Sequence, residues 1–569
     1  MPKIVTVEQI RAIELAADKR GHSYADMMEQ AGRAVAERVK EIVLGIAAPR
    51  IAILVGPGNN GGDGLVAGRV LAEELEGASV GAFLLQPRGD DDAVFVKARE
   101  AGVFLADAEN DQGQGYRVLQ NLIANADVVI DALFGTSLRL PIKGDAAKVL
   151  EAVHKALGKR RDGQNMRLTT PASPGIVLDT GPRIIAVDCP SGLDCDSGAL
   201  DKNAIYADET ITMAAVKPGL LLFPGADAVG VLHVADIGLP KRLAELDGVK
   251  LILADVHEVA ARLPQRQRDS HKGTFGKALI VAGSMNYIGA VALCANAAYR
   301  SGAGLVTVAA PQIIVPMLAS MVAEATWVLL PHEMGVVNES AVKVLREEMD
   351  GYSALLIGPG LGREDVSGEF MLELLQPKAE IRRARAIGFV PLTPGDTAAQ
   401  ANIALPPLVI DADGLNLLAG IENWPELLPP GTILTPHPGE FARLTGLDVA
   451  DIQADRVRLA QEKAAEWGCV VVLKGAFTVV AAPAGLTAVM PFATTALAHA
   501  GTGDVLAGAI VGLRAQGLEP FDAAVVGAWL QGMAGVRAEA VLGTAASVTA
   551  GDVLELLPDA YALAESARR

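Results

Sequence analysis

The sequence predicts an α/β protein of two domains, each built on a mostly parallel sheet. Its 569 residues exceed one ordinary domain, since domains commonly run to ~100–200 residues. Short apolar runs alternate with helical stretches, which is the pattern of βαβ units. With 51% apolar residues and only four cysteines, the chain is neither disordered nor a disulfide scaffold.

The first half starts with helical periodicity over residues 8–44, where apolar residues such as Leu15 recur. The run IAILV at 51–55 predicts a buried strand, followed by a glycine loop and a helix that ends near Glu76. Further buried strands are expected at 80–85, 128–134, 184–187 and 209–214. The polar, Pro- and Gly-rich residues 158–182 predict a long surface loop.

The alternation pauses at residues 236–250, which we expect to form a linker, and resumes near Leu251. The strands expected in the second half lie at 278–282, 305–309, 354–357, 407–410, 432–434 and 470–473. Residues 478–490 predict a β-hairpin, and residues 376–405 predict an irregular insertion.

The formal charge of −18 argues against nucleic-acid binding, which usually needs a basic stripe or patch. The short basic cluster at 159–161 is interpreted as part of a solvated loop. Residues 476–499 carry no charge, but Pro483 and Pro491 interrupt them, so no membrane-spanning helix is predicted. The start of the sequence shows no secretory h-region, so we expect a cytoplasmic protein.

The loop GPGNNGGDG at 56–64 follows the first strand and formally contains the dinucleotide-binding pattern G-x-G-x-x-G. That use needs an acidic residue at the end of the next strand, and residues 84–88 read LLQPR. A plain Rossmann dehydrogenase is therefore disfavoured. The glycines still allow backbone N–H groups to approach an anion at a helix start, although a simple tight turn is the alternative.

Two other predicted strands end on acidic residues, Asp131 and Asp188. The carboxyl ends of parallel strands face the ligand crevice, so we expect Asn60, Asp131 and Ser191 to converge there. Amide, carboxylate and hydroxyl oxygens suit a hard cation.

The turn after Asp188 contains two cysteines and two further acids. Cys189 and Cys195 are interpreted as incidental thiols rather than a redox pair. Asp194 and Asp196 are interpreted as loop formers rather than catalysts.

Three spaced motifs resemble the NAD(P)H-hydrate epimerase family, which has the YjeF N-terminal domain. They are GPGNNGGDG (56–64), DALFGTSLRLPIKG (131–144) and AVDCPSGLDCDSG (186–198), and TITMAAVKPGL (210–220) also agrees. The resemblance implies that residues 1–240 form a Rossmann-like three-layer α/β/α domain.

The resemblance also implies site roles, beginning with a potassium ion held by Asn60, Asp131 and Ser191. The implied hydrate contacts are Asn59, Asn60, Gly61, Gly62, Asp63, Gly135, Thr136, Ser137, Leu138, Arg139, Leu140, Pro141 and Asp188. Asp188 would be the acid/base group at the hydrate carbon, and Lys217 would supply a nearby charge. The family usually has glycine where this chain has Ser137, so a shift of the loop is expected.

The segment AGTGDVLAG at 500–508 is the motif of the second half that points most specifically to a chemical function. A glycine-rich turn that opens a helix presents unpaired N–H groups to transferring phosphoryl oxygens. Asp504 would lie in the first helical turn, where a carboxylate can accept the proton of an attacking hydroxyl. The alternative is that Asp504 only caps the helix.

Other motifs also follow predicted strands: GPGLG at 358–362, DAD at 411–413, TPHPGE at 435–440 and KGAFT at 474–478. Two prolines rigidify the turn around His437, which fits a positioned site residue, although a lone histidine is usually structural. This order, with GTGD last, resembles the ribokinase-like superfamily. With HKGTFGKALIVAGS at 271–284 it resembles the ADP/ATP-dependent NAD(P)H-hydrate dehydratase family, which implies a ribokinase-like three-layer α/β/α domain over residues 250–569.

The second resemblance implies that Ala290, Gly360, His437 and Asp504 contact the hydrate. The implied nucleotide contacts are Lys474, Gly475, Ala476, Phe477, Thr478 and Gly503. Family members often read D-A-D-A-L-N, whereas this chain has Gly414 in place of the second alanine. The fusion of the two domains looks bacterial, so we expect ADP as the phosphoryl donor, Mg²⁺ on its phosphates and AMP as a product.

Together the resemblances imply repair of hydrated NAD(P)H, whose extra hydroxyl lies on C6 beside the ring nitrogen. Hydroxide leaves poorly and phosphate leaves well, so a kinase-like site suits dehydration of the S epimer. The first domain would interconvert the R and S epimers. The expected partners are the hydrate epimers and ADP, without nucleic acid or membrane, and a homo-oligomer is expected.

Two other functions stay open at this point. A ribokinase-like small-molecule kinase with an accessory ligand-binding domain shares GTGD and would release a stable phosphorylated product. A non-enzymatic binding module, like related domains of mRNA-decapping scaffolds, would be expected to lack the NNGGD and Asp188 side chains, which this chain keeps.

Overall fold

The computed structural model describes residues 2–162, 181–376 and 405–568. The chain divides into two compact units, Pro2–Val249 and Lys250–Arg569, and each has its own large sheet. Most of the loop predicted at 158–182 and nearly all of the insertion predicted at 376–405 lie outside the described residues.

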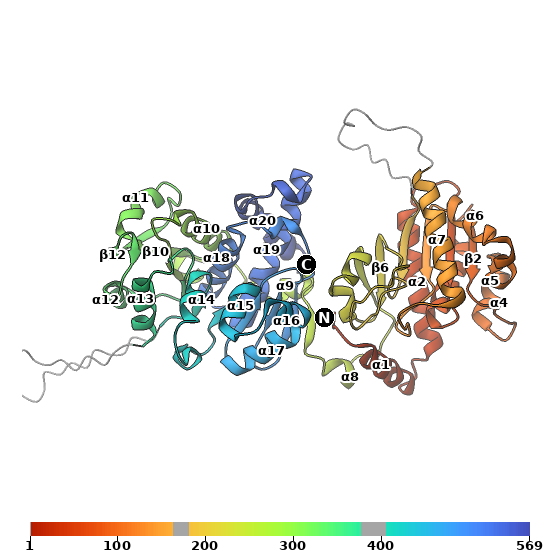
Figure 1. Ribbon diagram of the computed structural model, residues 1–569, viewed down its shortest axis with the longest axis horizontal. Helices are drawn as coiled ribbons and strands as arrows, with labels where there is room; N and C mark the ends of the chain where they lie inside the picture. Colours follow the sequence, from red (N-terminus) through yellow and green to blue (C-terminus); the bar gives the residue numbers. More distant parts are fainter. Residues whose placement is uncertain (1, 163–180, 377–404, 569) are drawn as a thin grey trace, which may run out of the picture. The chain divides into compact units, whose positions relative to one another are not determined.

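The first unit, coloured from red to yellow in Figure 1, contains a seven-stranded parallel sheet in the order β3-β2-β1-β4-β5-β6-β7. The strands are β1 (Arg50–Val55), β2 (Ser79–Leu84), β3 (Phe104–Asp107), β4 (Val128–Ala132), β5 (Arg183–Val187), β6 (Glu209–Met213) and β7 (Val231–Ala235). The chain runs from β1 outward to β3 and then returns to β4 on the other side of β1. Such a switch point opens a crevice at the carboxyl ends of the strands.

Helices cover both faces of this sheet. They are α1 (Val7–Lys19), α2 (Tyr24–Ile42), α3 (Asn59–Glu74), α4 (Ala93–Glu100), α5 (Ala108–Asp111), α6 (Arg117–Asn125), α7 (Gly144–Asp162) and α8 (Ala244–Asp247). Alternate residues of β1 point to opposite faces, so Ile53 packs in a core with α2 and α3, whereas Leu54 packs with α6 and α7. The predicted three-layer α/β/α architecture is confirmed.

Several local predictions differ from the structure. The expected N-terminal helical range is two helices, because Thr6 and Ser23 each start a helix with a capping box. Leu15, predicted on the apolar face, is 45% exposed. The expected linker contains α8, and its Leu243 is buried in a small core with Val5. The backbone of the basic cluster at 159–161 belongs to α7 and is not a loop.

The second unit contains a ten-stranded sheet in the order β11-β10-β9-β14-β15-β16-β17-β18-β19-β8. The strands are β8 (Leu251–Leu253), β9 (Lys277–Val281), β10 (Leu305–Pro311), β11 (Thr326–Leu330), β14 (Ala354–Ile357), β15 (Leu408–Ile410), β16 (Ile433–Leu434), β17 (Val470–Leu473), β18 (Val479–Ala481) and β19 (Thr487–Val489), with β12 (His332–Glu333) and β13 (Val336–Val337) paired separately. Neighbours pair in parallel except at β17–β18 and β18–β19, where the predicted hairpin is confirmed.

The helices of the second unit place the glycine-rich turn of the GTGD motif. They include α9 (Val256–Arg262), α10 (Ile288–Arg300), α14 (Asp413–Leu418), α15 (Pro438–Thr445), α17 (Arg456–Trp467), α18 (Thr502–Ala515), α19 (Pro520–Leu542) and α20 (Ala550–Ser566). Residues of α9, α10, α18, α19 and α20 share one core. Gly508 lets α18 approach α10, since an added Cβ would lie 2.2 Å from the carbonyl oxygen of Cys294. This close contact fixes the position of α18 against α10.

The strands that the sequence did not predict are β3, β7, β8, β11 and the pair β12–β13. The first four lie at sheet edges, where less burial weakens the apolar signal of a strand. Within residues 2–162, 181–376 and 405–568, no helix is long and apolar enough to cross a bilayer.

Glu209 anchors an ion network that joins α2 to the sheet. Its buried carboxylate accepts hydrogen bonds from Arg38 at 2.6 Å and from Arg183 at 3.3 Å, and it contacts His233 at 2.9 Å. These groups lower the pKa of Glu209 to about 2, with the hydrogen bond from Arg38 as the largest cause.

We expect Glu209→Gln to lower the free energy of unfolding of the first unit by about 2 kcal/mol at pH 7, allowing for solvent screening of the partly exposed arginines. The pKa falls from 4.5 to about 2 on folding, so this stabilisation is present above pH 4.5 and is lost as the pH falls toward 2. Denaturant unfolding at several pH values measures it. Glu41→Gln removes the exposed partner of the same Arg38 and should cost less than about 1 kcal/mol. Equal losses in the two variants would contradict this assignment.

Candidate active sites

The crevice between β1 and β4 gathers the predicted motifs of the first unit. The residues of NNGGD form the first turn of α3, which has no side-chain cap, so their N–H groups lie at an open helix start. Arg88, just beyond β2, donates to the carbonyl oxygens of Gly56 and Gly58 at 2.8 and 2.9 Å. The guanidinium of Arg88 therefore stabilises the glycine loop. It lies close to the position where a dinucleotide-binding site has an acidic residue.

Asn60 is a buried polar side chain without a protein partner. It is 9% exposed, and neither Oδ1 nor Nδ2 finds a hydrogen bond among the described residues. Gly135, in the loop after β4, lies against it, since a Cβ there would be 3.4 Å from Oδ1. An unpaired buried amide costs about 1–3 kcal/mol, so this arrangement is typical of a group that binds a ligand.

Asp131 and Ser191 meet in this crevice as predicted. The Ser191 hydroxyl donates to Asp131 Oδ1 at 2.6 Å, and the Ser191 N–H donates to Oδ2 at 2.7 Å. Phe134 N–H in turn donates to the Ser191 hydroxyl at 3.0 Å. Burial raises the pKa of Asp131 to about 6 despite these bonds. A cation would favour the ionised carboxylate.

Asp188 follows β5 in a left-handed backbone conformation, with φ of 66°. Its Oδ1 accepts hydrogen bonds from Lys217 Nζ, from Thr212 Oγ1 and from Met213 N–H. Lys217 is 1% exposed and also donates to Thr212 Oγ1 and to Met213 O. The ammonium group of Lys217 is thus in direct contact with the Asp188 carboxylate, as expected. Asp188 Oδ2 accepts no hydrogen bond from the described residues.

Residues 135–141 form the loop between β4 and α7. The guanidinium of Arg11 from α1 donates to Ser137 Oγ at 3.3 Å and to Thr136 O at 3.5 Å. Ser137, where the family usually has glycine, therefore ties the loop to α1. The sequence gave no signal for this contact, because Arg11 lies far from the motif along the chain.

The turn after β5 corrects one prediction. Cys189 and Cys195 form a disulfide, so their interpretation as incidental thiols is wrong. Asp194 Oδ1 accepts hydrogen bonds from the backbone of Asp196 and Ser197, which confirms its role as a loop former. The turn brings the two cysteines together, a constraint that their sequence spacing alone did not reveal.

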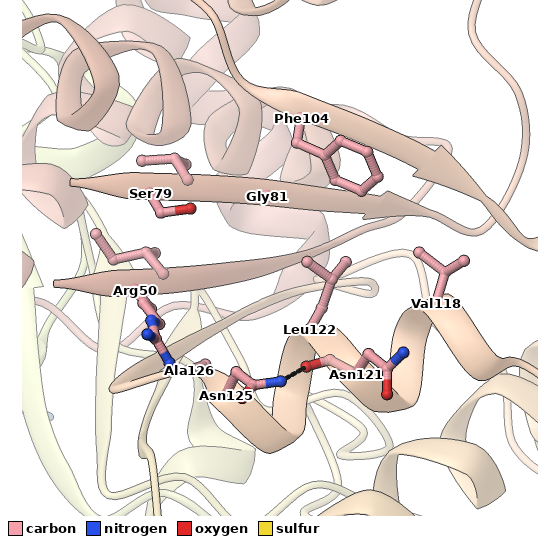
Figure 2. Close-up of a pocket in the computed structure, with 11 residues that line it drawn as sticks. Arg50, Ser79, Gly81, Phe104, Val118, Asn121, Leu122, Asn125 and Ala126 are labelled. Carbon is pink, nitrogen blue, oxygen red and sulfur yellow. Dashed lines mark hydrogen bonds between the residues drawn. The ribbon is translucent and has the colours of Figure 1, made fainter. Parts of the chain in front are cut away.

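The first unit also has a pocket of about 350 Å³ away from this crevice (Figure 2). Arg50 and Ser79 at the starts of β1 and β2 line it with Leu122 and Asn125 of α6. Because it lies at the amino ends of the strands, it is at the edge of the sheet opposite the predicted motifs. Ligands of open parallel sheets bind at the carboxyl ends, so this pocket is separate from the candidate site.

In the second unit, α18 begins with an open turn at the GTGD motif. Gly501 is the N-cap residue with φ of 88°, and no side chain caps the helix. The Asp504 carboxylate accepts no hydrogen bond from the described residues, so the interpretation of Asp504 as a helix cap is not supported. Burial and then the charge of Asp411 raise the pKa of Asp504 to about 7, while Lys474 opposes the rise. Its carboxylate can therefore gain or lose a proton near neutral pH.

Lys474 connects this turn to the strand ends. Its Nζ donates to Asp411 Oδ1 at 2.6 Å and lies 3.6 Å from Glu440 Oε2. A Cβ on Gly503 would lie 3.5 Å from Nζ, so the ammonium group is beside the first turn of α18. Burial lowers the pKa of Lys474, but the charges of Asp411 and Glu440 raise it by more. The pKa is therefore raised overall, which keeps the lysine charged.

His437 is both a helix cap and a site candidate. Its Nδ1 accepts from Gly439 N–H at 3.0 Å, and its own N–H donates to Glu440 Oε2 at 2.8 Å, which makes a capping box. Burial, Lys474 and Arg443 lower the pKa of His437. A neutral ring that accepts at Nδ1 carries its proton on Nε2, where it can donate to a ligand.

Ala290 and Gly360, predicted to touch the hydrate, lie close together. Gly360 has φ of 64°, and a Cβ there would be 3.4 Å from Ala290 Cβ and 2.6 Å from Tyr287 Cβ. Tyr287 was missed by the sequence. Gly414 starts α14 close to β14, since an added Cβ would lie 2.9 Å from the carbonyl oxygen of Ile357. The departure from the family pattern therefore fits a close backbone approach.

Residues 474–478 form the turn between β17 and β18. Thr478 Oγ1 donates to the carbonyl oxygen of Gly475 at 2.9 Å, and Phe477 has φ of 52°. Arg456 of α17, which the sequence did not single out, donates to the carbonyl oxygen of Lys474 at 3.2 Å. Ala476 lies in the same turn, beside the start of the hairpin.

Comparisons with known proteins cover both units. The family described as "YjeF-related protein N-terminus" matches residues 24–219, and "NAD(P)H-hydrate dehydratase" matches residues 278–381 and 396–559. A bifunctional NAD(P)H-hydrate repair enzyme of Moorella thermoacetica is 36% identical over 541 residues, which are 94% of this chain and 91% of that protein. The chain belongs to the bifunctional NAD(P)H-hydrate repair enzyme family.

A further relative agrees with this membership. The repair enzyme of Escherichia coli is 32% identical and covers 93% of this chain and 88% of its own length. A crystal structure of the ADP/ATP-dependent NAD(P)H-hydrate dehydratase of Bacillus subtilis is 30% identical, covers 55% of this chain and 98% of its own, and has a TM-score of 0.43. The predicted family is confirmed, and matches in both halves favour it over a small-molecule kinase with an accessory domain.

Because the Asn60 amide is buried and unpaired, we expect Asn60→Leu to raise the free energy of unfolding of the first unit by about 1 kcal/mol in potassium-free buffer. Denaturant unfolding measures the change. Ser191→Ala is the matched comparison: it removes hydrogen bonds to Asp131 and Phe134, so it should lower the same free energy by about 1–3 kcal/mol. A destabilised Asn60→Leu protein would show that Asn60 has a structural partner.

Proposed function

We propose that this protein repairs hydrated NADH and NADPH. The first unit interconverts the R and S hydrates, and the second dehydrates the S form with ADP, giving AMP and phosphate. The observation that carries the proposal is Asp504. Its carboxylate has a pKa of about 7 and lies at a helix start that no side chain caps. A cytoplasmic location and a homo-oligomeric state are part of the proposal and rest on the sequence alone.

In the second unit, Asp504 accepts the proton of the C6 hydroxyl as its oxygen attacks the terminal phosphorus of ADP. The N–H groups at the start of α18 and the ammonium group of Lys474 stabilise the transferring phosphoryl oxygens. AMP leaves, the ring nitrogen expels phosphate from C6, and the C5 proton passes to the departing phosphate, which restores the double bond. His437, Ala290 and Gly360 are proposed to position the nicotinamide ring, and Lys474–Thr478 with Gly503 to hold the nucleotide.

Magnesium fits this site as a companion of the nucleotide. Within the described residues, no group of three or more His, Cys, Asp or Glu side chains could hold a metal ion by itself. Mg²⁺ is usually held by one or two carboxylates together with substrate phosphates, and Asp411 and Asp413 at the end of β15 supply carboxylates there. When bound, Mg²⁺ would neutralise charge on the diphosphate.

The decisive assay incubates the full-length protein with both hydrate epimers and either ADP or ATP, and follows NAD(P)H absorbance and free phosphate together. Repair predicts equal amounts of both products, whereas kinase action predicts a stable phosphorylated compound. We expect Asp504→Asn to slow the nucleotide-dependent reaction about 10²–10⁴-fold. The wild-type rate should rise as the pH passes through about 7, because Asp504 must lose its proton to act as a base.

Asp559→Asn, on the exposed surface of α20, is the matched control and should leave this rate unchanged. Retained activity in Asp504→Asn would remove Asp504 from the mechanism. Phosphate release with ATP alone would correct the choice of donor and leave the repair reaction intact.

In the first unit, Asp188 is proposed as an acid/base group at C6, oriented by Lys217. The NNGGD turn of α3 and the loop of residues 135–141 are proposed to bind the hydrate. The unpaired Asn60 amide, with Asp131 and Ser191, fits a hard cation such as K⁺, which prefers oxygen ligands. When bound, K⁺ would fix the loop that carries Gly135.

We expect replacement of K⁺ by a large organic cation to slow R-to-S conversion several-fold, because the organic cation is too large to fit between Asn60 and the loop at Gly135. Chromatography of the two epimers without nucleotide measures the rate. Dehydration of purified S hydrate, measured in the same buffers, separates this effect from general salt effects. An unchanged conversion rate would argue against the cation site.

A further inference from the structure

Helix α1 contributes to the first site although it lies outside the segment matched by the family, which starts at residue 24. Ile4, just before the helix, pairs with Val216, next to Lys217. Val7 N–H then donates to Asp196 Oδ1 at 2.8 Å, in the turn that follows Asp188. The helix start is therefore fastened to the segments that carry the Asp188–Lys217 pair.

The next turn of α1 reaches the opposite loop of the site. Arg11 bonds to Thr136 and Ser137, as described above. Glu14 lies three residues later, so it shares this face of the helix with Arg11. Its side chain is half-buried, and its carboxylate accepts no hydrogen bond from the described residues. A carboxyl group is thus held among the site loops without a structural partner.

The surroundings of Glu14 are rich in charge. Burial and then the charge of Asp188 raise the pKa of Glu14, while Lys217 and Arg11 oppose the rise. Burial, Asp188 and Glu14 raise the pKa of Asp63 well above its usual range. Tyr24, at the start of α2, has its pKa raised by burial and then by Glu14 and Asp18.

The negative charges of this cluster oppose its full ionisation. Three carboxyl groups, Glu14, Asp63 and Asp188, interact with one another, and only Asp188 is paired with the buried Lys217. Like charges in a site of low dielectric share a proton rather than all ionise. Because the pKa values of Glu14 and Asp63 are both raised, these two groups keep a proton to higher pH than they would in water.

We propose that Glu14 is a second proton-transfer group for the epimerisation reaction, acting together with Asp188; this rests on the proposed function. The protonated Glu14 carboxyl gives its proton to the C6 hydroxyl, the C6–O bond breaks, water forms, and the nitrogen lone pair makes a C6=N1 iminium. Water then adds to the other face of C6, its proton passes to a carboxylate of the cluster, and the electron pair returns to nitrogen. No oxidant or further reactant is consumed.

The test compares Glu14→Gln, Glu14→Asp and Glu8→Gln in the full-length protein. Glu8 lies on the same helix but is exposed, which makes it the matched control. R-to-S conversion is followed by chromatography without nucleotide, from about pH 5 to about pH 9. Glu14→Gln should slow conversion about 10²-fold or more and lose the fall in rate toward alkaline pH, because its amide cannot ionise. Glu14→Asp should restore part of the rate and the alkaline fall, and Glu8→Gln should match the wild type.

Two readouts separate this role from a structural one. The thermal unfolding of the first unit and its stabilisation by K⁺ should be alike in Glu14→Gln and the wild type, and dehydration of S hydrate should be unchanged. The proposal is overturned if Glu14→Gln converts the epimers within about threefold of the wild type, or if it is slow yet keeps the alkaline fall. A wild-type protein that never exceeds the spontaneous rate overturns the epimerase function itself, and Glu14 with it.

Discussion

In both units a lysine holds a buried carboxylate at the carboxyl end of a parallel sheet, and the chemistry of each site depends on that pair. Lys217 bonds to Asp188 after β5, and Lys474 bonds to Asp411 after β15. Each charge depends on the other, since removal of one partner from a buried pair typically lowers the free energy of unfolding by about 3–5 kcal/mol. Parallel strands make such pairs possible because their carboxyl ends all open into one crevice.

Each lysine neutralises one carboxylate and leaves other acids beside it. In the second unit the additional acid is Asp504. Burial is the largest cause of its pKa of about 7, and the charge of Asp411 is the next. In the first unit the additional acids are Glu14 and Asp63, whose pKa values are both raised by burial and by Asp188. In a crevice with more carboxylates than cations, the unpaired acids keep a proton to higher pH than they would in water, which suits a general acid or base.

Local sequence patterns predict the features that one segment determines by itself. The buried strand at 51–55 is uniformly apolar because helices cover both faces, and the GTGD turn places Asp504 correctly on α18. Contacts between distant segments are not predictable in this way: Lys474 meets its partner 63 residues away, and Arg11 meets Ser137 126 residues away. The cap at His437 is an intermediate case, since Glu440 has the right spacing but histidine is an unusual cap.

The two reactions make opposite demands on water, which gives a physical reason for two sites in one chain. Epimerisation through loss and return of the C6 oxygen needs water next to the ring and a proton that can move both ways. Phosphoryl transfer needs water kept away, because water would compete with the C6 hydroxyl for the phosphorus. An uncapped helix start and a charged lysine favour the second reaction, whereas a proton held by Glu14 or Asp63 favours the first. A single crevice could not meet both demands, since the water that serves one reaction would waste the phosphoryl donor of the other.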